Sequence, residues 1–188
     1  SEMCIRDRYM ASDCLSEDAE AVLSAIENCD PLNDFVRFER YWADPDEKNR
    51  TAFQSLIRNE MAVQNYLELA IWYYSIGQVG RAEKVLSMSP GDAETAYWRA
   101  YLSQDRELLE KADVSDVSFV FPFREESVPV FEWAMKESGN WRSAYLLALV
   151  HYSRNNDAEA LELLRKQGRE PDFAPFYITL SLIHISEP

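Results

Sequence analysis

The stretch of sequence that decides the fold class is Leu69-Ala70-Ile71-Trp72-Tyr73-Tyr74-Ser75-Ile76-Gly77. It aligns with Leu147-Ala148-Leu149-Val150-His151-Tyr152-Ser153-Arg154-Asn155, which shares its Leu, Ala, Tyr and Ser, at an offset of 78 residues. At the same offset Ala82 meets Ala160, and Leu86 meets Leu164. This separation equals about two repeats of the helical-hairpin class, whose units span roughly 34–47 residues. We therefore expect internal repeats made of paired helices.

Apolar residues recur at helical spacing along the whole chain, without any long period-two pattern typical of strands. Ser16 is a candidate N-cap for the first helix, Asp44-Pro45 ends the second, and Gly77 and Pro90 end the fourth and fifth. A further helix begins around Phe173. The segments that mark the ten preceding helices are 19–26, 35–42, 53–57, 66–73, 82–86, 97–101, 108–112, 130–134, 145–152 and 161–164. These observations predict an all-α fold of antiparallel hairpins.

The two ends of the chain look like opposite strands of one DNA segment. Residues 1–8 can be encoded by a sequence whose reverse complement, read in frame, encodes residues 180–187. That segment resembles a transposase adapter used in sequencing libraries, and such segments are set aside before fold reasoning. We expect residues 1–8 and 180–188 to be adapter-derived and residues 9–179 to be part of a longer natural protein, so no localisation is predicted.

Composition excludes several classes of protein. The chain has 188 residues, is 47% hydrophobic and 13% aromatic, and carries a formal net charge of −14. Intrinsically disordered chains are less hydrophobic than this, and no apolar run approaches a membrane span. Nucleic-acid binding relies on Lys and Arg, so the acidic balance argues against it. We expect neither a nucleic-acid nor a membrane partner.

The aligned stretches resemble the tetratricopeptide repeat family. That family places an aromatic residue, a Leu, a small residue and a Tyr along its first helix, then a Gly, and a small and a large apolar residue on its second helix. The residues that fill this pattern are Tyr66, Leu69, Ala70, Tyr73, Gly77, Ala82 and Leu86. In the later unit His151 replaces the Tyr and Asn155 the Gly, and Asn tolerates positive φ. The resemblance implies an α–α superhelix, or solenoid, of such hairpins.

The resemblance divides the chain into consecutive units. Residues 9–59 supply N-terminal helices, residues 60–90 the best hairpin, and residues 141–179 a second hairpin with a following helix. Between them, residues 93–140 form a degenerate unit with an aromatic insertion loop at 117–125. Phrases at 55–60, 66–70, 120–124 and 170–177 also resemble the repeat region of certain large bacterial proteins associated with carbohydrate use.

No residue pattern predicts catalysis, a cofactor or a metal. Gly77 and Gly80 lack the Lys-Ser/Thr partner of a phosphate loop. Outside the adapter stretches the chain holds one histidine, His151, and two cysteines, Cys14 and Cys29, too few for a zinc site. His151 occupies a repeat-packing position, and acidic pairs such as Glu125-Glu126 fall on polar faces. We expect a protein that is not an enzyme, with no cofactor and no metal.

The resemblance implies that a partner lies along the inner, concave face formed by the first helix of each hairpin. The residues placed there by this register are Gln64, Ile71, Tyr74, Arg142, Tyr145, Leu149 and Tyr152. This lining is apolar and rich in tyrosine, as interface anchors often are. It lacks the Lys/Asn/Arg set with which some family members hold a terminal carboxylate.

The aromatic stretch Ser118-Phe119-Val120-Phe121-Pro122-Phe123-Arg124 is predicted to be extended. We expect it to fold back and fill the gap left by the degenerate unit; the alternative is a docking loop for a neighbouring domain. The predicted function is a protein-interaction or scaffolding module from a larger bacterial protein, whose partner is a protein, a peptide or another domain of the same chain. The alternative is the non-catalytic C-terminal part of a carbohydrate-active enzyme.

Overall fold

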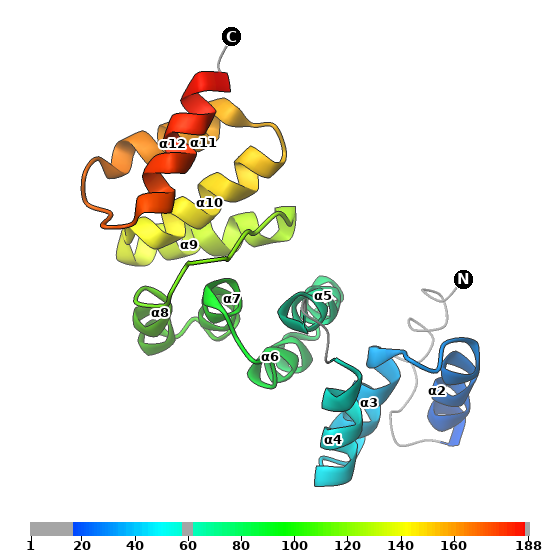
Figure 1. Cartoon of the computed structure of the whole chain (residues 1–188). Helices are drawn as coiled ribbons and strands as arrows, with labels where there is room; N and C mark the ends of the chain where they lie inside the picture. The colour runs from blue at the N-terminus through cyan, green and yellow to red at the C-terminus, as the bar shows by residue number, and fades with distance from the viewer. Residues whose placement is uncertain (1–16, 58–61, 187–188) are drawn as a thin grey trace. The chain divides into compact units, whose positions relative to one another are not determined.

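The computed structural model describes residues 17–57 and 62–186 (Figure 1). Within these ranges the chain is all-helical, with eleven α-helices, one short 3-10 helix and no strand. None of these helices combines the length and apolar character that crossing a bilayer requires. The predicted adapter stretch 1–8, Cys14, the N-cap Ser16 and the start of the hairpin at residue 60 lie outside the described ranges.

The chain divides into two compact units, Ser1–Met88 and Ser89–Pro188. The described helices of the first unit are α2 (Glu17–Cys29), α3 (Asp34–Ala43), α4 (Glu47–Leu56), α5 (Ala62–Ser75) and α6 (Val79–Ser87). Those of the second unit are α7 (Ala93–Ser103), α8 (Arg106–Ala112), η1 (Glu125–Ser127), α9 (Val128–Ser138), α10 (Trp141–Ser153), α11 (Asp157–Gln167) and α12 (Ala174–Ser186).

An aromatic core holds the first unit together. Helices that follow one another pack as the pairs α2–α3, α3–α4 and α5–α6. The rings of Phe38 on α3 and Phe53 on α4 lie 5.4 Å apart, and Phe53 lies 5.5 Å from Tyr66 on α5. Because rings of this size bury a large apolar area and favour edge contacts, these residues link α5 to the helices before it.

The α5–α6 hairpin is built on small residues, as the sequence predicts. Ala70 and Ala82 are fully buried where the two helices pack, together with Tyr73 and Leu86. Gly77 ends α5 in the left-handed region, with φ of 78°. The amide of Gly77 donates to the carbonyl of Tyr74 at 2.9 Å, and that of Gln78 to the carbonyl of Tyr73 at 2.9 Å. This pair of bonds is the Schellman motif, which satisfies carbonyls at a helix end.

The same turn joins α7 to α8 and α10 to α11 in the second unit. The left-handed residue is Gln104 in one case, with φ of 52°, and Asn155 in the other, with φ of 62°. Asn155 donates to the carbonyl of Tyr152 at 3.0 Å, and Asn156 to that of His151 at 2.9 Å. The replacement of Gly77 by Asn155 at the matched position therefore keeps the turn, as expected from the tolerance of Asn for positive φ.

The α7–α8 hairpin exchanges large and small residues relative to the α5–α6 hairpin. Seven residues before its turn lies Tyr97, where the other hairpin has Ala70, and four residues before it lies Ala100 in place of Tyr73. All four side chains are fully buried. The stretch predicted to be a degenerate unit thus contains a hairpin of the same kind. Its large side chain lies about one helical turn further from the hairpin turn than in the α5–α6 hairpin.

Candidate functional site

The three candidate residues of the first unit lie on α5, and they differ in accessibility. Ile71 is buried, at 8% exposure, whereas Gln64 and Tyr74 are half-buried. Tyr74 lies in the last turn of α5, and its carbonyl accepts the hydrogen bond from Gly77 that closes the helix. Of the three, Tyr74 and Gln64 therefore keep part of their surface available to a partner.

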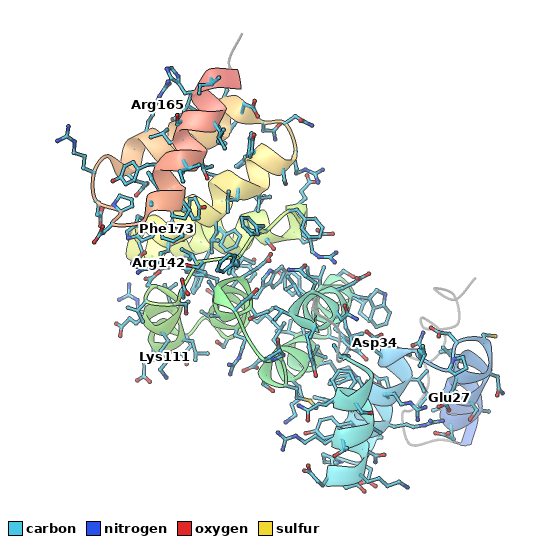
Figure 2. All side chains as sticks on the ribbon, viewed as in Figure 1. Glu27, Asp34, Lys111, Arg142, Arg165 and Phe173 are labelled. Carbon is cyan, nitrogen blue, oxygen red and sulfur yellow. The ribbon has the colours of Figure 1, made fainter. Side chains whose placement is uncertain are left out.

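The four candidate residues of the second unit lie on α10 and do not form one open face. Tyr152 is 38% exposed, but Tyr145 is 2% exposed and Leu149 is 9% exposed. The ring of Tyr145 packs 5.6 Å from Phe173 and 5.7 Å from Phe176 (Figure 2 labels Phe173). Burial raises the pKa of the Tyr145 hydroxyl. Tyr145 is a core residue because the chain entering α12 covers it, a long-range contact that the repeat register did not include. Leu149 is buried as well.

Arg142 is occupied by contacts within its own unit. Its Nη1 donates to the backbone carbonyl of Asp113 at 2.9 Å, and its guanidinium lies 4.6 Å from the ring of Trp141. It thereby ties the residue that follows α8 to the start of α10. This geometry makes Arg142 a residue that positions the segment after α8.

Each unit contains a cluster of buried polar side chains that hydrogen-bond to one another. In the first unit the fully buried Glu39 of α3 accepts from the Tyr73 hydroxyl at 2.5 Å and from Arg81 Nε at 3.0 Å. In the second, Trp98 Nε1 donates to the Ser127 hydroxyl at 2.9 Å, which donates to Glu94 at 2.7 Å. A buried charge is costly unless paired and hydrogen-bonded, so these contacts fix how helices meet.

Tyr97 and Asp113 form another buried pair in the second unit. The Tyr97 hydroxyl donates to Asp113 Oδ1 at 2.8 Å. Burial, and then the nearby Asp113 carboxylate, raise the pKa of Tyr97 above its usual value. In the described ranges, no group of three or more His, Cys, Asp or Glu side chains is placed to hold a metal ion.

The aromatic stretch at 117–125 corrects the expectation that its phenylalanines fill a gap in the core. Val117, Val120 and Pro122 are the buried residues of this stretch. Three phenylalanines point outward, with exposures of 92% for Phe119, 67% for Phe121 and 48% for Phe123. We call these three residues the phenylalanine ridge. The prediction of an extended stretch is wrong for Ser118 and Phe119, which form a turn closed by the bond from the Val120 amide to the Val117 carbonyl. From Val120 to Phe123 side chains alternate between the core and the surface, as in an extended segment, and the smaller ones face the core.

The backbone that carries the phenylalanine ridge is held at several points. The Ser118 amide donates to Asp116 Oδ1 at 2.8 Å, and the Val120 amide to the Val117 carbonyl at 3.3 Å. At the other end, Arg154 Nη2 forms an ion pair with Glu125 Oε2 at 2.7 Å. These bonds hold the turn that carries Phe119, and the ion pair joins the end of the stretch to the residue after α10.

Comparison with models of known families, with curated proteins and with solved structures finds no match for this chain. The relation to tetratricopeptide repeats accordingly stays a prediction made from the residues of the hairpins.

Proposed function

We propose that this chain is a protein-interaction module, made of tetratricopeptide-like helical hairpins that stack as a solenoid, with no catalysis of its own. Each hairpin presents part of its first helix to a protein or peptide partner. The residues that contact the partner are those of the predicted face that keep accessible surface, chiefly Tyr74 on α5 and Tyr152 on α10.

The observation that carries this proposal is the matched placement of these two tyrosines. Each lies three residues before the left-handed residue of a Schellman turn, and each keeps exposed surface while the small residues of its hairpin are fully buried. Tyrosine presents a large, rigid apolar ring with a polar end, and such residues are enriched at protein interfaces. Two hairpins of one design therefore hold the same kind of anchor at the same place.

Burial reduces the number of predicted contact residues that a partner can reach. A partner that docks onto the described fold cannot reach Tyr145 or Leu149, since both are in the core, and Arg142 is engaged by a backbone carbonyl. The contribution of these residues is to hold the presenting helix in place. The proposal therefore assigns binding to the ends of α5 and α10, near their turns.

The test is selection of peptides from a random displayed library against the intact chain, followed by affinity measurements on purified peptides. We expect Tyr74→Ala or Tyr152→Ala to weaken binding of selected peptides by about tenfold, a loss of about 1.4 kcal/mol. Tyr177→Ala is the matched control, because Tyr177 is 37% exposed but lies on α12. If a variant that carries both Tyr74→Ala and Tyr152→Ala binds every selected peptide as tightly as the unmodified chain, the proposal is wrong.

A further inference from the structure

The phenylalanine ridge combines two features that both oppose stability. Phe119 is 92% exposed and has a φ of 60°, in the left-handed region that disfavours bulky side chains. A residue with this backbone conformation outside glycine and asparagine is strained, and strain of this kind concentrates at ligand-binding sites. Neither core packing nor turn formation requires a phenylalanine there, because its ring leaves the core and its turn favours Gly or Asn.

The ridge is the right size for a small docking surface. Phenylalanine exposes roughly 200 Å² when fully accessible, so the three exposed fractions amount to about 400 Å² of apolar surface. Patches of this size on single chains are often functional. A stable dimer buries about 800 Å² on each partner, so the ridge alone is too small to join two copies of this chain.

Carboxylates border the ridge on both sides. Asp116 precedes it and is fully exposed, while Glu125 and Glu126 follow it and are also exposed. The guanidinium of Arg124 lies 5.1 Å from the Phe123 ring, and Arg154 pairs with Glu125. The exposed border therefore holds three carboxylates, of which Glu125 is paired with Arg154, and one arginine within the stretch, Arg124. An apolar centre with acidic edges complements a surface that is apolar in its centre and basic at its edges.

We propose that the phenylalanine ridge docks a protein segment with an apolar centre and flanking lysine or arginine residues, with Phe119 as the anchor. This goes beyond the proposed function, since the ridge uses a different part of the chain from Tyr74 and Tyr152. Two other occupants fit the charges less well. A second copy would bring its own carboxylates against those of the first, and anionic lipid headgroups would be repelled by them.

The test uses two fluorescein-labelled amphipathic peptides of matched length, one made of leucine and lysine and the other of leucine and glutamate. Fluorescence anisotropy measures their affinity for the full chain and for three variants. The triple variant Phe119→Ser, Phe121→Ser, Phe123→Ser removes the ridge and keeps every charge. The double variant Asp116→Asn, Glu126→Gln keeps the ridge. Leu32→Ser is the matched control, because Leu32 is 73% exposed elsewhere in the sequence.

We expect the leucine–lysine peptide to bind the full chain and to lose about tenfold or more in affinity for the triple variant. The charge variant is expected to lose about two- to tenfold and to respond less to added salt, as for solvent-exposed charge pairs. Leu32→Ser is expected to bind like the unmodified chain. Circular dichroism checks that each variant stays folded; substitutions at exposed rings leave the core intact.

The proposal is wrong if the triple variant binds the leucine–lysine peptide as tightly as the full chain does, or if the full chain binds the leucine–glutamate peptide as tightly as the leucine–lysine peptide. It is also wrong if the chain floats with phosphatidylcholine vesicles, or forms a dimer in light scattering, only when the ridge is intact. The last two assign the ridge to a membrane or to a second copy. Loss of binding in the Tyr74 and Tyr152 variants is measured separately, so either proposal can fail without the other.

Discussion

Replacing Phe119 by glycine is expected to have opposite effects on two quantities: the free energy of unfolding and the affinity of the phenylalanine ridge for its proposed partner. Phe119 is held at a φ of 60° and only about a tenth of its surface is covered. Glycine adopts this conformation without steric cost. We therefore expect Phe119→Gly to stabilise the second unit while it removes the anchor of the proposed docking surface. Most substitutions that delete a large apolar side chain are instead expected to lower the free energy of unfolding.

The magnitude follows from three contributions. Relief of the left-handed conformation is worth about 1–2 kcal/mol. Against it stands the greater backbone entropy of glycine in the unfolded chain, about 0.4–1 kcal/mol. The covered part of the Phe119 side chain is about 15 Å², which at about 25 cal/mol per Å² contributes less than about 0.5 kcal/mol. The central values give an expected net gain of about 0.4 kcal/mol, or a rise in Tm of about 2–3 °C for a unit of this size.

The assay is thermal and urea unfolding of the full chain followed by circular dichroism, with Phe119→Ala as the matched control. Alanine removes the same ring but keeps the strained backbone, so the difference between Phe119→Gly and Phe119→Ala isolates the backbone contribution. We expect glycine to be the more stable of the two by about 1 kcal/mol. If Phe119→Gly unfolds at the same temperature as Phe119→Ala, or below it, the explanation by backbone strain is wrong.

Three further substitutions test the buried contacts. Arg81→Met leaves the fully buried Glu39 without its ion-pair partner, and we expect a loss of about 3–5 kcal/mol in urea unfolding; a loss below about 1 kcal/mol contradicts a stabilising pair. Burial and Asp113 raise the pKa of Tyr97 above 10.0, so the folded chain keeps a proton that the unfolded chain releases as the pH rises. Tyr97 alone should then lower the free energy of unfolding above pH 10 by about 1.4 kcal/mol per pH unit, and Tyr97→Phe should reduce the measured slope by that amount, leaving the contribution of other buried tyrosines such as Tyr145. Gly77→Ala places a side chain at φ of 78° in open space, so only the backbone conformation is penalised, and we expect the free energy of unfolding to fall by about 1 kcal/mol. An unchanged Tm would contradict a left-handed conformation at this position.

The hairpins could be predicted from the sequence because their determinants are local. Gly77 and Asn155 mark the same turn, and the small residues Ala82 and Ala160 follow each turn by five positions. A turn and the first contacts after it involve residues less than about two helical turns apart, and spacing alone reports such contacts. The helix ends at Asp44-Pro45 and Gly77 were predicted for the same reason.

Contacts between distant segments could not be predicted in this way. Tyr145 occupies a position that the register assigns to an open face, yet Phe173 and Phe176 cover it. The spacing of these two phenylalanines indicates a helix face, but it does not say which helix they will cover. The same limit applies to the phenylalanine ridge. Alternation predicts that half of its side chains face outward, and only the packing decides that the smaller half fills the core.

The α7–α8 hairpin explains why matching residues at a fixed offset found two hairpins and missed another. Where α5 has Ala70 and Tyr73, α7 has Tyr97 and Ala100, so residue identity is lost although one large and one small side chain are still buried one turn apart. Close packing constrains the volume that two helices enclose more strictly than it constrains which residue supplies that volume. A search that scores the combined size of residues four and seven positions before a Gly, Asn or Gln would therefore find this hairpin from the sequence, because the left-handed turn and the enclosed volume are the features that all the matched hairpins share.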